Sequence, residues 1–191
     1  CTRHRGELPP SHEVPGRWPS RETDHRFADY AALVHDALGD RVDLWTTLNE
    51  PWVVTDGGYL HGILAPGHDS PFEAPRASKN LLLAHAAGVA AYRAEGKGQI
   101  GLVVNLEPKY AASGSEEDAA AVRRADAYMN LQYLDPLLLG AYPSELTEMF
   151  GEAWPVIPPW DIVELMQPID FIGVNYYTRG LTKNDPAVPI E

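Results

Sequence analysis

The chain has 191 residues, of which 45% are hydrophobic, and this is enough to build one packed domain. Its 27 acidic residues against 15 basic ones give a formal net charge of -12, so we expect neither nucleic acid nor an anionic membrane as a partner. No apolar run approaches the roughly 18 residues of a membrane helix, and the one cysteine, Cys1, excludes an internal disulfide and fits a reducing, cytoplasmic compartment.

The first predicted helix follows an irregular lead-in. Residues 1–16 contain three prolines and no hydrophobic periodicity, so one domain is expected over 17–191. The helix is predicted to begin at Ser20, which can cap its first turn, and to end before Gly39. Its apolar stripe consists of Phe27, Ala31, Val34 and Leu38.

Short apolar runs then alternate with further helical patterns. The runs are "VDLWTTLN" at 42–49, "QIGLVVNLEP" at 99–108 and "DFIGVNYYT" at 170–178. The helical patterns cover 78–96, 115–134, 142–150 and 161–167. The glycine-crowded residues 57–68 are expected to form a loop, and His85, on the apolar stripe of its helix, is expected to be a core or interface histidine with its hydrogen bonds satisfied. Strands that alternate with helices predict an α/β fold with a parallel sheet, and their apolar character predicts helices on both faces.

Each predicted strand ends in polar or aromatic side chains. They are Asn49 and Glu50, Asn105 and Glu107, and Asn175, Tyr176 and Tyr177. Because the carboxyl ends of parallel strands meet at one edge, where α/β proteins bind ligands, we expect these groups to share a site. Amides, carboxylates and phenols at one rim predict hydrogen bonding to a polyhydroxylated ligand, a sugar.

Glu50 is the candidate for acid/base chemistry in "TTLNEPWV". Pro51 is expected to hold Glu50 in extended geometry, while Trp45 and Trp52 shield the carboxyl group so that it keeps its proton and acts as an acid. Cleavage of a glycosidic bond with retention uses two carboxylates roughly 5–5.5 Å apart. One carboxylate after a strand is equally consistent with a helix cap or a surface group, so the pattern alone leaves both interpretations open.

Six segments, in this order, resemble glycoside hydrolase family 1, the β-glucosidase-type retaining enzymes. They are "TLNEPWV", "GYLHGILAPG", "NLLLAHAAGVAAYR", "VVNLEPKY", "LDPLLLGAYP" and "DFIGVNYYT". The resemblance runs from about Trp18 to about Lys183 and implies part of a (β/α)8 TIM barrel, about three βα units that resemble strands four to six.

The resemblance also implies roles at the predicted rim. Glu50 matches the general acid/base, and Asn49 matches the residue that contacts the sugar 2-hydroxyl. Tyr177 matches the phenol that hydrogen-bonds the nucleophile, and Asn175 lines the same pocket.

On the aglycone side, the resemblance makes Trp52 an aromatic platform and places Asn105 near it. The implied activity is hydrolysis of terminal β-D-glucosyl residues from cello-oligosaccharides or aryl glucosides. It requires no metal and no other cofactor.

The family pattern is incomplete in this sequence. The Thr-Glu-Asn-Gly segment that carries the nucleophile is absent, as are the sugar-binding Gln and His of the first and third strands. Glu107 also precedes a proline, but its segment does not carry the nucleophile in the family, so we expect a loop or structural carboxylate. We therefore expect a truncated, recombined or frame-shifted reading of a longer gene. The alternative to a working glycosidase is an incomplete fragment that binds sugar weakly, associates with itself or assembles with a complementing chain.

Overall fold

The computed structural model describes residues 17–96 and 98–187, so the lead-in expected over 1–16 lies outside the described residues. The α-helices are α1 (Glu22–Leu38), α2 (Pro51–Thr55), α3 (Glu73–Glu95), α4 (Glu116–Asp126), α5 (Gln132–Leu138), α6 (Ser144–Phe150) and α7 (Pro159–Leu165). Two π-helical segments, η2 (Asp56–Leu60) and η3 (Ala127–Leu131), and one 3-10 turn, η4 (Gly151–Ala153), extend them. The strands are β1 (Leu44–Asn49), β2 (Gln99–Leu106), β3 (Lys109–Ala111), β4 (Phe171–Tyr176) and β5 (Gly180–Thr182).

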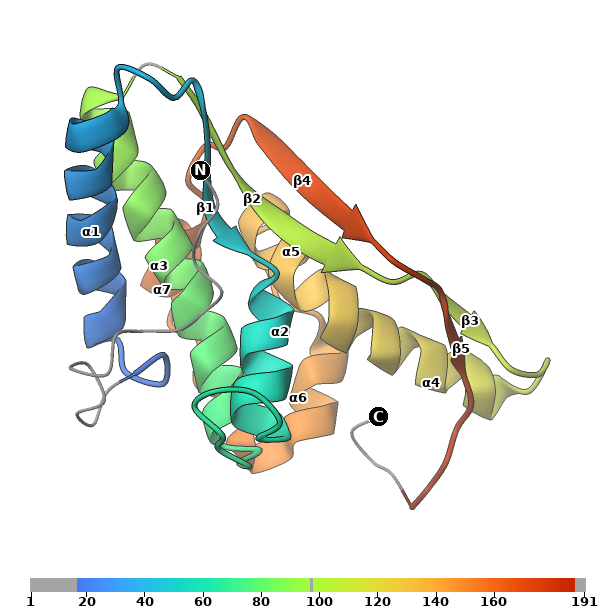
Figure 1. The fold of residues 1–191 in the computed structure, drawn as a ribbon. Helices are drawn as coiled ribbons and strands as arrows, with labels where there is room; N and C mark the ends of the chain where they lie inside the picture. The colour runs from blue at the N-terminus through green and yellow to red at the C-terminus, as the bar shows by residue number, and fades with distance from the viewer. Residues whose placement is uncertain (1–16, 97, 188–191) are drawn as a thin grey trace.

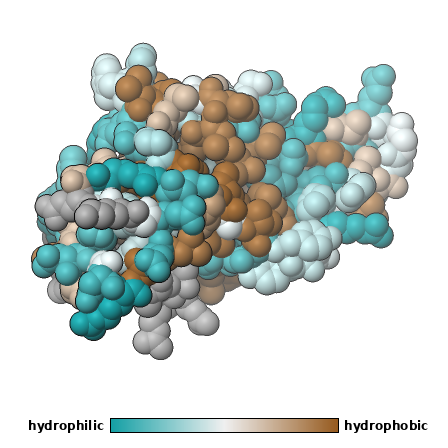
Figure 2. Space-filling model, turned by 90° about the horizontal axis from the view of Figure 1, so that it is seen from above, coloured by the Kyte–Doolittle hydropathy of each residue, from teal (hydrophilic) through white to brown (hydrophobic). Residues whose placement is uncertain are grey.

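A parallel three-stranded sheet in the order β1-β2-β4 organises the molecule, as the alternating pattern predicts (Figure 1). Helices α2, α3 and α5 lie beneath it in this view. In the described part of the chain no helix covers the opposite face, which we expected to be covered. On that face Leu44 of β1 is exposed, and Figure 2, seen from above, shows hydrophobic surface across the middle of the molecule.

Side chains alternate between the two faces of the sheet, so one set packs in the core and the other set lies on the helix-free face. Leu102 and Val104 of β2 pack with the helices in the larger core cluster. The alternate residues of β2, Gly101, Val103 and Asn105, face the helix-free side. Their register partners on β4 are Phe171, Gly173 and Asn175. Amides from neighbouring strands therefore share the helix-free face near the carboxyl edge.

Helix α1 confirms the first predicted helix. The Ser20 hydroxyl accepts a hydrogen bond from the Glu22 N–H at 3.3 Å. Phe27 is buried in the larger core, while Val34 and Leu38 pack against a smaller cluster under the amino-terminal half of the sheet.

The loop predicted over 57–68 is wrong in its first part, because η2 continues the helix through Leu60. Tyr59 and Leu60 are buried in the core, and this burial holds the segment helical. Gly57 and Gly58 serve close packing here. A Cβ on Gly57 would lie 2.5 Å from the Leu64 side chain.

Two further features were not predicted. Strands β3 and β5 form a second, two-stranded parallel sheet. Asp161, with a fully buried side chain, pairs with Arg21 and Lys79 and so joins α7 to α1 and α3.

None of the helices in the described ranges has the length and apolar character that crossing a membrane requires.

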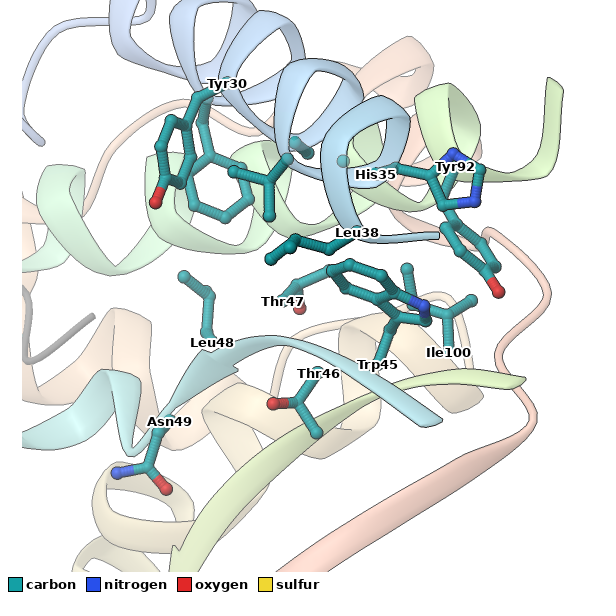
Figure 3. A pocket seen from close by; sticks show the side chains of 14 residues that line it. Tyr30, His35, Leu38, Trp45, Thr46, Thr47, Leu48, Asn49, Tyr92 and Ile100 are labelled. Carbon is teal, nitrogen blue, oxygen red and sulfur yellow. The ribbon is translucent and has the colours of Figure 1, made fainter. Parts of the chain in front are cut away.

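A groove of about 240 Å³ lies between α1 and β1 (Figure 3). Tyr30 and Leu38 line it from α1, and Trp45, Thr46 and Asn49 line it from β1. Among the described strands β1 pairs with β2 alone, so its other edge faces this groove with unpaired backbone groups.

Candidate active site

Glu50 connects β1 to α2 in a left-handed backbone conformation, φ 52° and ψ 61°, and the predicted extended geometry is wrong. The residue before a proline is kept out of the right-handed helical region, yet here the chain must pass from strand to helix within one residue. The Glu50 N–H still donates to Val103 O at 2.9 Å, while Glu50 O already accepts from the Val53 N–H at 3.0 Å. A left-handed non-glycine residue costs roughly 1–2 kcal/mol and persists where its surroundings fix it.

Two side chains from the end of β4 hold the half-buried Glu50 carboxylate. Asn175 Nδ2 donates to Glu50 Oε1 at 2.8 Å and to Asn49 Oδ1 at 3.1 Å. The Tyr177 hydroxyl donates to the same Glu50 oxygen at 2.6 Å. This hydrogen bond raises the pKa of Tyr177, although the phenol is 73% exposed, because a phenolate would lose the bond and face the carboxylate charge. Four predicted site residues therefore meet, and their catalytic roles stay predictions.

The two tryptophans that were expected to shield Glu50 lie elsewhere or are packed inward. Trp45 belongs to the smaller core cluster and donates its indole N–H to Val42 O at 2.8 Å. Trp45 lies five positions before Glu50, about 16 Å along the strand, so this part of the prediction is wrong. Trp52 is half-buried against the larger core and edge-on to Tyr128, with ring centroids 6.4 Å apart. Its role as an aglycone platform stays a prediction.

Asn105 and Glu107 lie at the end of β2. Asn105 is buried and is the register partner of Asn175, and its contact with substrate stays a prediction. The Glu107 carboxylate forms an ion pair with Lys109. The Glu107 peptide is bracketed by Asn130, whose Oδ1 accepts the Glu107 N–H at 3.0 Å and whose Nδ2 donates to Glu107 O at 2.9 Å. Both contacts fit the structural role expected of Glu107.

His85 is buried as predicted, but only one of its ring nitrogens is satisfied among the described residues. Its Nδ1 lies 2.6 Å from Thr47 Oγ1, and its buried Nε2 contacts no polar group in the described ranges. Burial lowers the pKa of His85 to about 4, which keeps the ring neutral. The loop histidines pair with carboxylates: His61 lies 3.5 Å from Asp56, and His68 lies 2.7 Å from Glu73.

Comparison with known proteins places this geometry in one family. The family model described as "Glycosyl hydrolase family 1" matches residues 2–191. Beta-glucosidase A of Thermotoga maritima is 40% identical over 190 residues, which cover 98% of this chain and 43% of the relative. The beta-glucosidase of Agrobacterium sp. is 37% identical over 192 aligned residues, 42% of its own length.

Solved structures agree in fold. The family 1 b-glucosidase from Thermotoga maritima superposes with a TM-score of 0.93 over 97% of this chain and 42% of its own, at 40% identity. A beta-glucosidase from Exiguobacterium marinum gives a TM-score of 0.92 at 34% identity, over 98% of this chain and 44% of its own. The chain thus spans less than half the length of these relatives. With its α/β sheet, its acidic strand end and these matches, the chain belongs to glycosyl hydrolase family 1.

Proposed function

We propose that this chain carries the acid/base half of a retaining β-glycosidase site, with Glu50 as the general acid/base. The observation that supports it most is the pair of hydrogen bonds that Asn175 and Tyr177 make to Glu50 Oε1 at the carboxyl edge of the sheet. Relatives named beta-glucosidase support a terminal β-D-glucosyl substrate, and one solved relative from Thermotoga maritima is described in complex with glucoimidazole. On this proposal β1, β2 and β4 are strands four to six of the family barrel, and the protein acts in the cytoplasm.

The chemistry assigns a separate task to each group. Glu50 protonates the glycosidic oxygen as the bond breaks and then, as a carboxylate, activates the water that releases the sugar. Asn175 fixes the carboxylate and the Asn49 amide together, so Asn49 keeps its own N–H groups for a sugar hydroxyl. Glu107 is paired with Lys109, and its segment does not carry the nucleophile in the family, so on this proposal the nucleophilic carboxylate comes from a complementary segment.

A second candidate, an incomplete fragment that assembles with a complementing chain or with itself, is favoured by the groove between α1 and β1. Its apolar walls and the unpaired edge of β1 suit an added parallel strand. We propose that a strand of the complementary barrel segment occupies this groove. The match covers only 42–44% of the solved relatives, and their chains contain the remaining part of the barrel.

The experiment compares hydrolysis of nitrophenyl β-glucoside and of cellobiose by the 191-residue chain, Glu50→Gln and Glu107→Gln. Each is assayed alone and after refolding with the unmatched parts of Thermotoga maritima Beta-glucosidase A. Glu50→Gln should lower the rate 10²–10⁴-fold, an order-of-magnitude range for general acid catalysis. The loss should be larger for cellobiose, whose leaving group needs a proton, and Glu107→Gln should match the parent.

Activity that appears only with the added parts supports the second candidate, an incomplete fragment that needs a complementing chain. Activity of the 191-residue chain alone refutes that candidate. Hydrolysis of cellobiose by Glu50→Gln at the parent rate would refute the acid/base assignment.

A further inference from the structure

The two π-helical segments meet in space. The Tyr128 hydroxyl of η3 donates to Asp56 Oδ1 of η2 at 2.8 Å. Tyr128 is 8% exposed and the Asp56 side chain is largely buried, so this is a shielded, charge-assisted hydrogen bond. π segments are rare in helices and recur at functional sites. Here η2 continues α2, which begins directly after Glu50, and η3 continues α4.

Tyr128 contacts α2 at both of its ends. Its ring lies edge-on to Trp52 in the first turn, at an interplanar angle of 71°, and its hydroxyl binds Asp56, the residue that caps the helix end. Helix α2 and its continuation η2 together run only from Pro51 to Leu60, which is too short for a helix that is stable on its own, so tertiary contacts decide where α2 lies. The residue that immediately precedes α2 is Glu50.

The same π segment also holds the neighbouring strand. Asn130, two residues after Tyr128, bonds both backbone groups of Glu107 at the end of β2. Strand β2 in turn accepts the Glu50 N–H through Val103 O at 2.9 Å. Segment η3 therefore contacts both α2, which follows Glu50, and the end of β2, the strand that accepts the Glu50 N–H.

We propose that Tyr128 and Asp56 form a positioning pair for Glu50, which fixes α2 so that Glu50 keeps its left-handed backbone and its carboxylate reaches Asn175 and Tyr177. This inference rests on the proposed function of Glu50. Left-handed geometry is unfavourable for a glutamate, and a residue before proline is extended by default. If α2 is released, Glu50 relaxes toward the extended form and its carboxylate leaves the two donors.

The experiment reads the position of Glu50 without any turnover. In the 191-residue chain, NMR of ¹³Cζ-labelled tyrosine follows the ionisation of Tyr177, whose pKa is raised by its hydrogen bond to Glu50. The Glu50→Gln variant gives the Tyr177 pKa without the carboxylate. We expect Tyr128→Phe and Asp56→Ala each to move the Tyr177 pKa at least halfway from the parent value to that of Glu50→Gln.

Two variants serve as matched controls. Asp56→Asn keeps an acceptor oxygen for the Tyr128 hydroxyl and should stay near the parent value. Tyr142→Phe removes a buried hydroxyl that contacts no polar group in the described ranges, and it should leave the titration of Tyr177 unchanged.

A parent-like Tyr177 titration in Tyr128→Phe and Asp56→Ala would overturn the inference and leave Tyr128 a packing residue, whatever the melting temperature does. If Tyr128→Phe does not fold, the comparison of Asp56→Ala with Asp56→Asn decides alone. Because this readout needs no hydrolysis, the positioning pair stands if the Tyr177 pKa moves in the two variants, even when the chain has no activity. If the chain is active but the Tyr177 pKa does not move in the two variants, the positioning pair is refuted and the acid/base proposal stands.

Discussion

Gly101 is the position in the sheet where one added methyl group has the clearest predicted cost. It lies in the central strand β2 opposite Phe171 of β4. A Cβ at Gly101 would lie 2.2 Å from the Phe171 carbonyl oxygen and 2.9 Å from its ring. The ring can rotate, but the carbonyl is backbone in a paired strand. Gly101→Ala therefore pushes β2 and β4 apart by about 1 Å, the gap between 2.2 Å and ordinary contact distance.

The expected loss in the free energy of unfolding is about 3 kcal/mol. Overpacking a well-packed core costs about 1–3 kcal/mol, and we take the upper end because backbone forms the obstacle and β1 resists from the other side. This loss is a large part of the 5–15 kcal/mol that is typical of a domain. Displacement of β4 also carries Asn175 and Tyr177 away from Glu50, so the pKa of Tyr177 should fall toward its ordinary value.

Urea unfolding, followed by circular dichroism and tryptophan fluorescence, measures the cost. Gly114→Ala is the matched control, because a Cβ there meets nothing within 4 Å and its φ is not positive. The control should stay within about 0.5 kcal/mol of the parent. A Gly101→Ala variant that is as stable as Gly114→Ala would refute the argument from strand spacing.

Two further predictions concern buried ionisable groups. Asp161→Asn removes the negative charge that faces Arg21 and Lys79. Because Arg21 is 40% exposed and can reach water, we expect the free energy of unfolding to fall by about 3 kcal/mol, the lower end of the range for a broken buried pair. An unchanged midpoint in urea unfolding would contradict this prediction. His85, with its pKa lowered to about 4, is neutral when folded, whereas the unfolded chain takes up a proton below about 6.5. The free energy of unfolding is therefore unaffected by His85 protonation above pH 6.5 and falls by about 3 kcal/mol as the pH drops from 6.5 toward 4. The His85→Gln variant, measured over the same pH range, should lack this part of the acid destabilisation.

The meeting of Asn49, Glu50, Asn175 and Tyr177 could be predicted from the sequence. Each residue directly ends or follows an apolar run, and parallel strands bring their carboxyl ends to one edge. The Ser115 hydroxyl caps α4 by accepting the Asp118 N–H at 3.1 Å, across the three-residue spacing that is typical of a helix start.

The surroundings of the site could not be predicted, because local rules were overridden by tertiary contacts. A period of 3.6 residues puts Val122, Met129 and Tyr133 on one face of the predicted helix over 115–134. The π segment η3 inserts an additional residue, so the buried set comes to include Tyr128 and Asn130 as well. The wider turn places both polar side chains inward, where they meet Asp56 and Glu107, and periodicity alone contains no signal for it.

The contacts that make Glu50 a candidate acid join residues far apart in the chain. Asn175 and Tyr177 follow Glu50 by 125 and 127 residues, and β2, paired with both β1 and β4, brings them to Glu50. No contact from the open edge of β1 is needed for them, since β4 lies on the other side of β2. On the proposed function, the acid half of the site is therefore organised within the described chain itself. A complementing segment that enters at β1 would add its own carboxylate to a Glu50 already held in place, and its binding energy would not be spent on ordering that residue.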